Sequence, residues 1–66
     1  MLITDKTTAK ELDRVYIGEE ITFEEKSGLV YRIAIFKSIS LYSYVFQLVN
    51  GELIIIRRNW SKNNQF

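Results

Sequence analysis

Hydrophobic and polar residues follow a helical period in the first quarter of this chain and a strand period over most of the rest. Ala9, Leu12 and Val15 recur at helical spacing. The four residues that start at Thr8, Thr-Ala-Lys-Glu, match a capping box, and Gly18 is a natural helix terminator. The pattern therefore predicts an N-terminal helix of about two turns, which is too short to persist in water unless its apolar stripe packs against other elements.

The next segment reads as a first β-hairpin. Residues 20–25 alternate polar with apolar, the tripeptide Lys26-Ser27-Gly28 predicts a turn with glycine at positive φ, and residues 29–37 form the partner strand. With Glu25 opposite Leu29, one side of the hairpin is apolar and the other is wet. The apolar side holds Ile21, Phe23, Tyr31, Ile33 and Ile35, and the wet side holds Glu20, Thr22, Glu24 and Arg32.

A second hairpin is predicted from residues 41–49 and 52–58, joined at Asn50-Gly51, because both central positions of a type I′ turn need positive φ. This turn places Val49 opposite Glu52. One face then holds Tyr42, Tyr44, Phe46 and Leu48 with Leu53, Ile55, Arg57 and Asn59, and the other holds Leu41, Ser43, Val45, Gln47 and Val49 with Glu52, Ile54, Ile56, Arg58 and Trp60. Since consecutive strand residues point to opposite faces, Arg57 and Arg58 do not form one basic patch.

Both faces of this second hairpin are apolar, which is more than one short helix can cover. The sheet can curl into a small open barrel, pair with a second copy of itself, or leave one side as a working surface. The predicted fold class is α+β, a short N-terminal helix followed by four antiparallel strands in two consecutive hairpins. We expect a single domain over residues 1–60 and a polar, frayed tail over residues 61–66.

Composition argues against an enzyme. The chain has no histidine and no cysteine, which removes the commonest general base and the soft metal ligands. Its paired carboxylates, Glu19-Glu20 and Glu24-Glu25, are adjacent in strands and so diverge, whereas an acid/base pair needs converging carboxyls. The three glycines are all expected in turns between elements, so the sequence contains no glycine-rich phosphate-binding loop. We expect no catalytic residues, no metal and no cofactor.

Charge is unevenly divided although the formal net charge is only +1. Residues 1–26 hold seven acidic and four basic residues, and residues 27–66 hold five basic and one acidic residue. No apolar run approaches the ~20 residues of a membrane span, and the N-terminus lacks the pattern of a signal peptide. A cytoplasmic protein that does not associate with membranes is expected.

These observations favour a protein that works by binding. The leading hypothesis is a small regulator or inhibitor that contacts a protein partner, or itself, through the second hairpin; length alone suggests a virus or mobile element as its source. The expected partner-binding residues are Tyr42, Tyr44, Phe46, Ile54, Ile56, Arg57, Arg58 and Trp60. One alternative is a single-stranded nucleic-acid binder that uses Tyr42, Tyr44, Arg57 and Trp60. The other is a homodimer with no site on the second hairpin.

Overall fold

The computed structural model describes residues 1–59 and gives a mostly β fold rather than the predicted α+β arrangement. Its elements are β1 (Leu2–Ile3), α1 (Ala9–Leu12), β2 (Glu20–Phe23), β3 (Lys26–Lys37), β4 (Leu41–Leu48) and β5 (Leu53–Asn59). They form one five-stranded sheet in the order β1-β2-β3-β4-β5, in which β1 is parallel to β2 and the other neighbours are antiparallel. Four antiparallel strands were predicted and are present, but both hairpins differ from the prediction in turn and register. The parallel strand β1 was missed, because two residues carry no periodicity.

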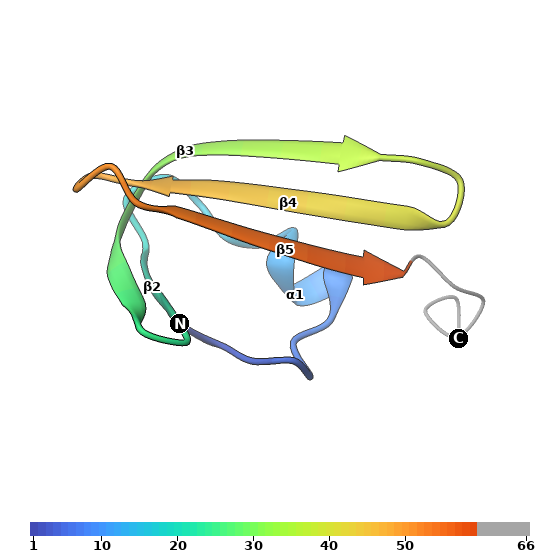
Figure 1. The fold of residues 1–66 in the computed structure, drawn as a ribbon, viewed down its shortest axis with the longest axis horizontal. Helices are drawn as coiled ribbons and strands as arrows, with labels where there is room; N and C mark the ends of the chain where they lie inside the picture. The colour runs from blue at the N-terminus through green and yellow to red at the C-terminus, as the bar shows by residue number, and fades with distance from the viewer. Residues whose placement is uncertain (60–66) are drawn as a thin grey trace.

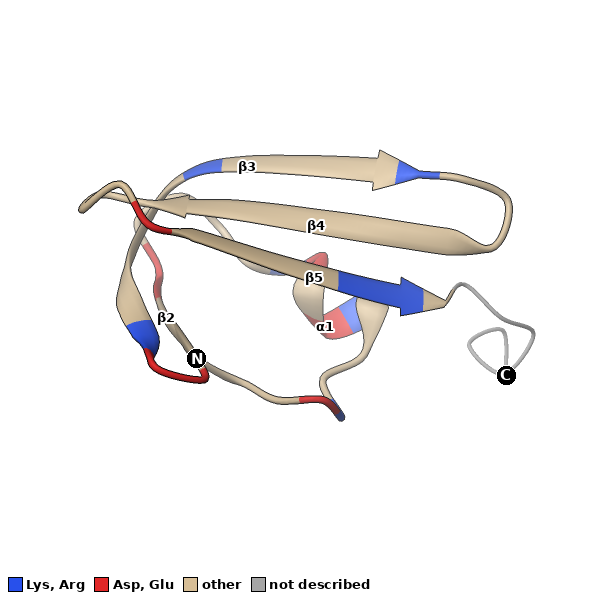
Figure 2. Ribbon diagram, viewed as in Figure 1, with Lys and Arg blue, Asp and Glu red and all other residues tan. Residues whose placement is uncertain are grey.

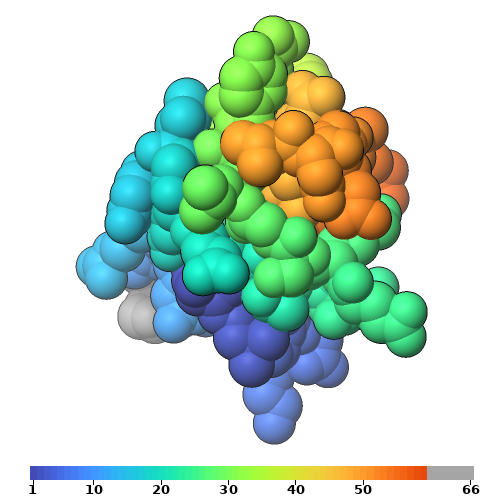
Figure 3. All heavy atoms as spheres, turned by 90° about the vertical axis from the view of Figure 1, so that its left-hand side faces the viewer, coloured from blue at the N-terminus to red at the C-terminus, as the bar shows by residue number. Residues whose placement is uncertain are grey.

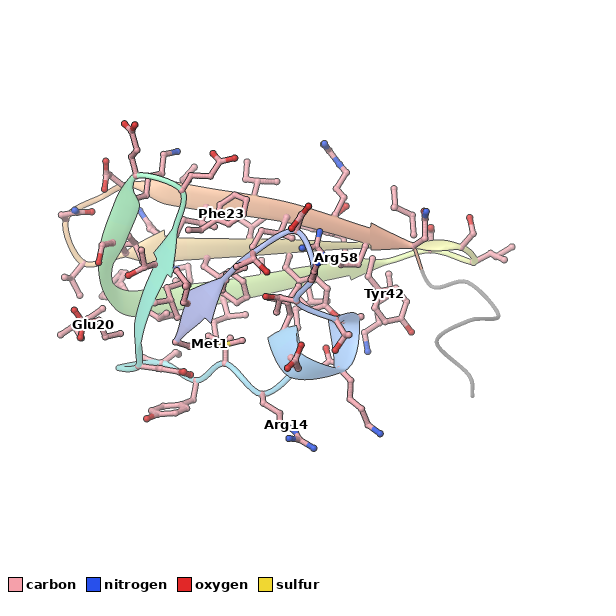
Figure 4. All side chains as sticks on the ribbon, turned by 90° about the horizontal axis from the view of Figure 1, so that it is seen from below. Met1, Arg14, Glu20, Phe23, Tyr42 and Arg58 are labelled. Carbon is pink, nitrogen blue, oxygen red and sulfur yellow. The ribbon has the colours of Figure 1, made fainter. Side chains whose placement is uncertain are left out.

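The long strand β3 joins the two halves of the sheet. Its first residues pair with β2 and its later residues pair with β4, with a bulge between Val30 and Arg32. At this bulge the strand bends, so that the β2–β3 hairpin folds down from the plane of β3, β4 and β5 (Figure 1). The helix and the N-terminal segment lie on one face of these three strands (Figures 1 and 4).

The helix begins as predicted and ends early. The Thr8 hydroxyl accepts from the Glu11 amide at 3.1 Å, and the Glu11 carboxylate accepts from the Thr8 amide at 2.9 Å, which completes the capping box. Only one turn follows, because the chain leaves the helix at Asp13. The next residues include valine, tyrosine and isoleucine, whose side chains lose rotamer freedom in a helix. Gly18, at φ 98°, instead donates to the Val30 carbonyl and brings the chain to the sheet.

The first turn lies earlier than the sequence predicted. Phe23 pairs with Lys26, so Glu24 and Glu25 form a two-residue turn in which Glu24 adopts φ 56°. Gly28 is not in the turn but in β3, opposite Ile21, where a Cβ atom would lie 3.4 Å from the Leu48 side chain. The glycine therefore serves close packing rather than chain reversal. Tyr31, predicted on the apolar side, is 55% exposed.

The second turn differs from the prediction by one residue. The Leu48 amide donates to the Glu52 carbonyl and the Gly51 amide donates to the Leu48 carbonyl, so three residues form the loop and Gly51 takes φ 94°. Tyr44 consequently pairs with Ile56 and Phe46 with Ile54. Because side chains alternate along a strand, this shift of one residue exchanges the two faces of β5 relative to the prediction.

The sheet is bent but does not close, and side chains bridge its two ends. The Lys26 ammonium donates to the Leu53 carbonyl at 2.7 Å, linking the β2–β3 turn to the start of β5. Seen from this end, the β4–β5 turn lies against β3 (Figure 3), in agreement with the Val49 amide donating to the Leu29 carbonyl. The core beneath the sheet consists of Ile3, Ala9, Leu12, Val15, Ile21, Val30, Tyr44, Phe46, Leu48, Ile54 and Ile56.

Candidate interaction surface

Half of the predicted partner-binding residues lie in the core. Tyr44, Phe46, Ile54 and Ile56 are all at most 3% exposed and face α1 and the N-terminal segment. The register shift explains this placement, because it puts Ile54 and Ile56 on the same face as Tyr44 and Phe46. One coherent apolar face is thereby buried. These four side chains cannot form a contact surface while the domain remains folded.

The remaining predicted residues separate. Tyr42 is half-buried against the core, with the Lys37 ammonium 5.0 Å from its ring centroid. Arg57 is exposed on the opposite face of the sheet, and Arg58 points toward the N-terminal segment, which confirms that the two arginines do not form one patch. Trp60 and the predicted tail over residues 61–66 lie outside the described residues.

Arg58 holds the N-terminal segment against β5. Its guanidinium donates to the Thr7 carbonyl through Nε at 2.6 Å and to the Thr4 carbonyl at 2.7 Å. A third bond runs to the Arg57 carbonyl at 2.8 Å. Figure 4 shows Arg58 beside this segment, beneath the strands. The planar fork of an arginine suits several carbonyl acceptors at once, so this residue stabilises the fold rather than offering a free cation.

Tyr44 couples the sheet to the helix. Its hydroxyl lies 3.1 Å from the Ala9 carbonyl and 2.9 Å from the Asp13 carboxylate, and donates into this pair of acceptors. Burial, reinforced by the hydrogen bond to Asp13 and by the negative charge of that residue, raises the pKa of Tyr44 well above its usual value. A tyrosinate here would lose its solvation and face a carboxylate. The folded protein therefore favours the protonated form of the Tyr44 hydroxyl.

Stability is expected to fall at alkaline pH through Tyr44. The unfolded chain releases the Tyr44 proton near the ordinary tyrosine pKa of about 10, whereas the folded chain retains it. Tyr44 therefore makes its full contribution to the free energy of unfolding below about pH 10. Above that pH the free energy of unfolding falls by at most about 1.4 kcal/mol per pH unit, until the pH reaches the pKa of Tyr44 in the folded chain. Urea unfolding of wild type and Tyr44→Phe between neutral and strongly alkaline pH measures it. A stability difference between them that does not change with pH contradicts the prediction.

The exposed side of β3, β4 and β5, which we name the outer face, carries three rows of side chains read from the strand register. The rows are Arg32, Gln47 and Leu53; Ala34, Val45 and Ile55; and Phe36, Ser43 and Arg57. The middle row is wholly apolar. Phe36 is 62% exposed, Ile55 51% and Leu53 43%, so large apolar side chains on the two strands that flank β4 are left in contact with solvent.

Charge on the outer face has one sign. Its two charged residues, Arg32 and Arg57, lie at opposite corners of the three rows, and the rows contain no aspartate or glutamate. Figure 2 shows how charged residues are distributed over the described part of the chain. Acidic and basic residues are mixed around α1 and the β2–β3 turn, whereas basic residues predominate along β3 and β5.

Three of the four residues predicted for nucleic-acid stacking lie in the described part of the chain, and they do not come together on one accessible face. Tyr44 is buried, Tyr42 lies on the inner side with Tyr44, and Arg57 lies on the outer side. Within the three rows of the outer face the only aromatic side chain is Phe36. A stacking surface for successive bases needs more than one aromatic ring beside a cationic groove.

Within residues 1–59, no group of three or more histidine, cysteine, aspartate or glutamate residues is placed to hold a metal ion. No helix in the described part of the chain is long and apolar enough to cross a membrane. Comparison with known proteins found no matching family model, no similar curated protein and no similar solved structure.

Proposed function

We propose that this chain is a small non-enzymatic protein-binding module, acting as a regulator or inhibitor, and that its outer face is the contact surface. One observation carries the proposal: Phe36, Leu53 and Ile55 are exposed around the half-buried Val45 on one face of a domain this small. The interior of protein interfaces is apolar and poor in charge, and arginine is enriched there. The composition of the outer face is closer to that of an interface core than to that of an ordinary solvent-exposed sheet face.

The charge of the outer face indicates the kind of partner. Two copies stacked through this face would bring four arginines and no carboxylate from the three rows into one interface, which opposes isologous stacking. A protein that carries acidic side chains on both sides of an apolar ridge would meet Arg32 and Arg57 with opposite charge. The partner that fits is therefore a protein with an apolar and acidic surface.

Substitutions on the outer face are expected to abolish partner recovery without unfolding the chain. Ile55→Asp inserts a charge into the apolar middle row, and Arg57→Glu reverses a corner charge; each is expected to weaken binding at least about thirtyfold. Ile17→Asp is the matched control, because Ile17 is a similarly exposed isoleucine, at 65%, in the segment between α1 and β2. Pull-down from cells of the source organism, followed by calorimetry with the recovered protein, measures the effect. Equal recovery by all three variants would refute the proposal.

A further inference from the structure

The two edge strands of the β3–β4–β5 sheet differ in whether their outward N–H and C=O groups are hydrogen-bonded. Strand residues of an antiparallel pair point their N–H and C=O groups alternately toward the partner strand and away from it. Because Leu48 and Glu52 form a hydrogen-bonded pair, residues 53, 55 and 57 of β5 point away from β4. Two of their carbonyls are occupied, Leu53 by the Lys26 ammonium and Arg57 by the Arg58 guanidinium. Side chains thus occupy two of the three outward carbonyls of the β5 edge.

The opposite edge begins with Val30 and is covered only there. The Val30 amide donates to the Glu19 carbonyl and the Val30 carbonyl accepts from the Gly18 amide. Beyond the bulge, the Ser38 amide donates to the Leu41 carbonyl, which fixes the alternation along β3. Ile33, Ile35 and Lys37 therefore point their backbone groups away from β4.

No described residue occupies those groups. Among residues 1–59, none donates a hydrogen bond to the outward carbonyls of Ile33, Ile35 and Lys37 or accepts one from their amides. In Figure 1 this half of β3 is the outermost strand, with no other strand beside it. Ile35 is 38% exposed although it faces the core side of the sheet, which agrees with an open edge. The Lys37 ammonium, which could shield the edge, lies over the Tyr42 ring instead.

We infer that two copies of this chain pair antiparallel along the open β3 edge, Ile35 opposite Ile35 of the second copy, to form one continuous sheet. In this register Ile33 lies opposite Lys37 of the second copy, so every outward N–H and C=O group of the three residues gains a partner. Registers shifted from this one leave some of these groups unpaired. The edge is thus complementary to itself under a two-fold axis.

Side chains fit this register on both faces of the sheet. On the outer face, Phe36 lies opposite Ala34 of the second copy, a large residue beside a small one, and the 62% exposure of Phe36 is reduced. On the inner face, the two Ile35 side chains cover each other. No two cations lie directly opposite, because Lys37 faces Ile33 and Arg32 faces Ser38. The contact is only one strand wide, so the dimer is expected to form at micromolar to millimolar concentration.

Proline substitutions test the edge directly. Ile35→Pro removes an amide that the monomer does not use, and Ile55→Pro removes the equivalent unused amide from the β5 edge. In sedimentation equilibrium from micromolar to millimolar concentration, wild type and Ile55→Pro are expected to dimerise, and Ile35→Pro to lose at least about tenfold in affinity. A monomer at every concentration, or equal loss in both variants, would overturn the inference.

Cysteine variants give a second measurement that does not depend on tolerance of proline. The wild-type chain has no cysteine, so each variant carries a single thiol. Under mild oxidation or with a short bis-maleimide, Ile35→Cys is expected to give covalent dimers and Ile55→Cys to remain monomeric; the reverse pattern would place the contact on β5 and overturn the inference. The substitution Ile35→Pro does not change the outer face, so a monomeric Ile35→Pro variant is still expected to bind the proposed partner. Failure of dimerisation would therefore not contradict the proposed partner binding, which is tested separately.

Discussion

Replacing Tyr44 with alanine is expected to leave the domain largely unfolded at 25 °C. Truncating a fully buried aromatic residue destabilises a protein by about 3–5 kcal/mol, and the lost hydroxyl adds about 1 kcal/mol. A domain of this size has a free energy of unfolding of only about 3–5 kcal/mol. Tyr44 is 0% exposed, and its ring stacks on Phe46 with 6.2 Å between centroids. Its hydroxyl also bonds to Ala9 and Asp13, so one side chain links the sheet to the helix.

Circular dichroism and urea unfolding measure this effect, with two controls. Tyr44→Phe keeps the ring and loses the bonds to Ala9 and Asp13, so it is expected to lose only about 1–2 kcal/mol. Tyr16→Ala removes a tyrosine that is 63% exposed and is expected to change stability by less than about 0.5 kcal/mol. Similar stability of Tyr44→Ala and Tyr16→Ala would contradict the assignment of Tyr44 to the core.

Local signals predicted the elements better than their registers. Thr8 and Glu11 identified the start of the helix from a four-residue pattern, and alternation identified four of the five strands. Both hairpin registers were wrong. Asn50-Gly51 suits a two-residue turn and also a three-residue loop with Gly51 at positive φ, and the sequence alone does not separate them. Whether the turn has two or three residues depends on which face of β5 packs against the core.

The first turn was misplaced for a different reason. Glycine is the usual residue at positive φ, yet here Glu24 takes that conformation while Gly28 lies in a strand beside Leu48. The requirement for a small residue at position 28 comes from a side chain twenty positions later in the sequence. A local pattern cannot contain such information, which is why tertiary packing overrode the turn signal.

The errors of register also changed which residues belong to the proposed contact surface. The sequence indicated correctly that β4 and β5 are apolar on both sides, which is the property that leaves an exposed patch. It assigned Ile54 and Ile56 to that patch, whereas the structure buries them and exposes Leu53 and Ile55. Shifting β5 by one residue thus moved two of the eight predicted contact residues, Ile54 and Ile56, into the core beside Tyr44 and Phe46. Phe36 was missed because the bulge in β3 sets which of its residues reach the outer face.

Replacing Arg58 with alanine is expected to lower the free energy of unfolding by about 2–3 kcal/mol and to release the N-terminal segment first. The substitution removes the charged donor of three carbonyl groups, and hydrogen bonds from charged donors contribute about 1.5–3 kcal/mol each before discounting for solvent. Two of the acceptors, the carbonyls of Thr4 and Thr7, belong to the segment that follows β1. That segment has no helix or strand of its own to hold it.

Limited proteolysis localises the loss, because Lys6 lies between the two acceptors and is exposed. Trypsin is expected to cut after Lys6 faster in Arg58→Ala than in wild type. Arg57 is the exposed neighbour on the outer face, so Arg57→Ala is expected to leave the cleavage rate unchanged and the free energy of unfolding within about 0.5 kcal/mol of wild type. Arg58→Lys keeps the charge without the fork and is expected to recover less than half of the lost stability. Equal behaviour of Arg58→Ala and Arg57→Ala would mean that the bonds to the N-terminal segment do not hold the fold together.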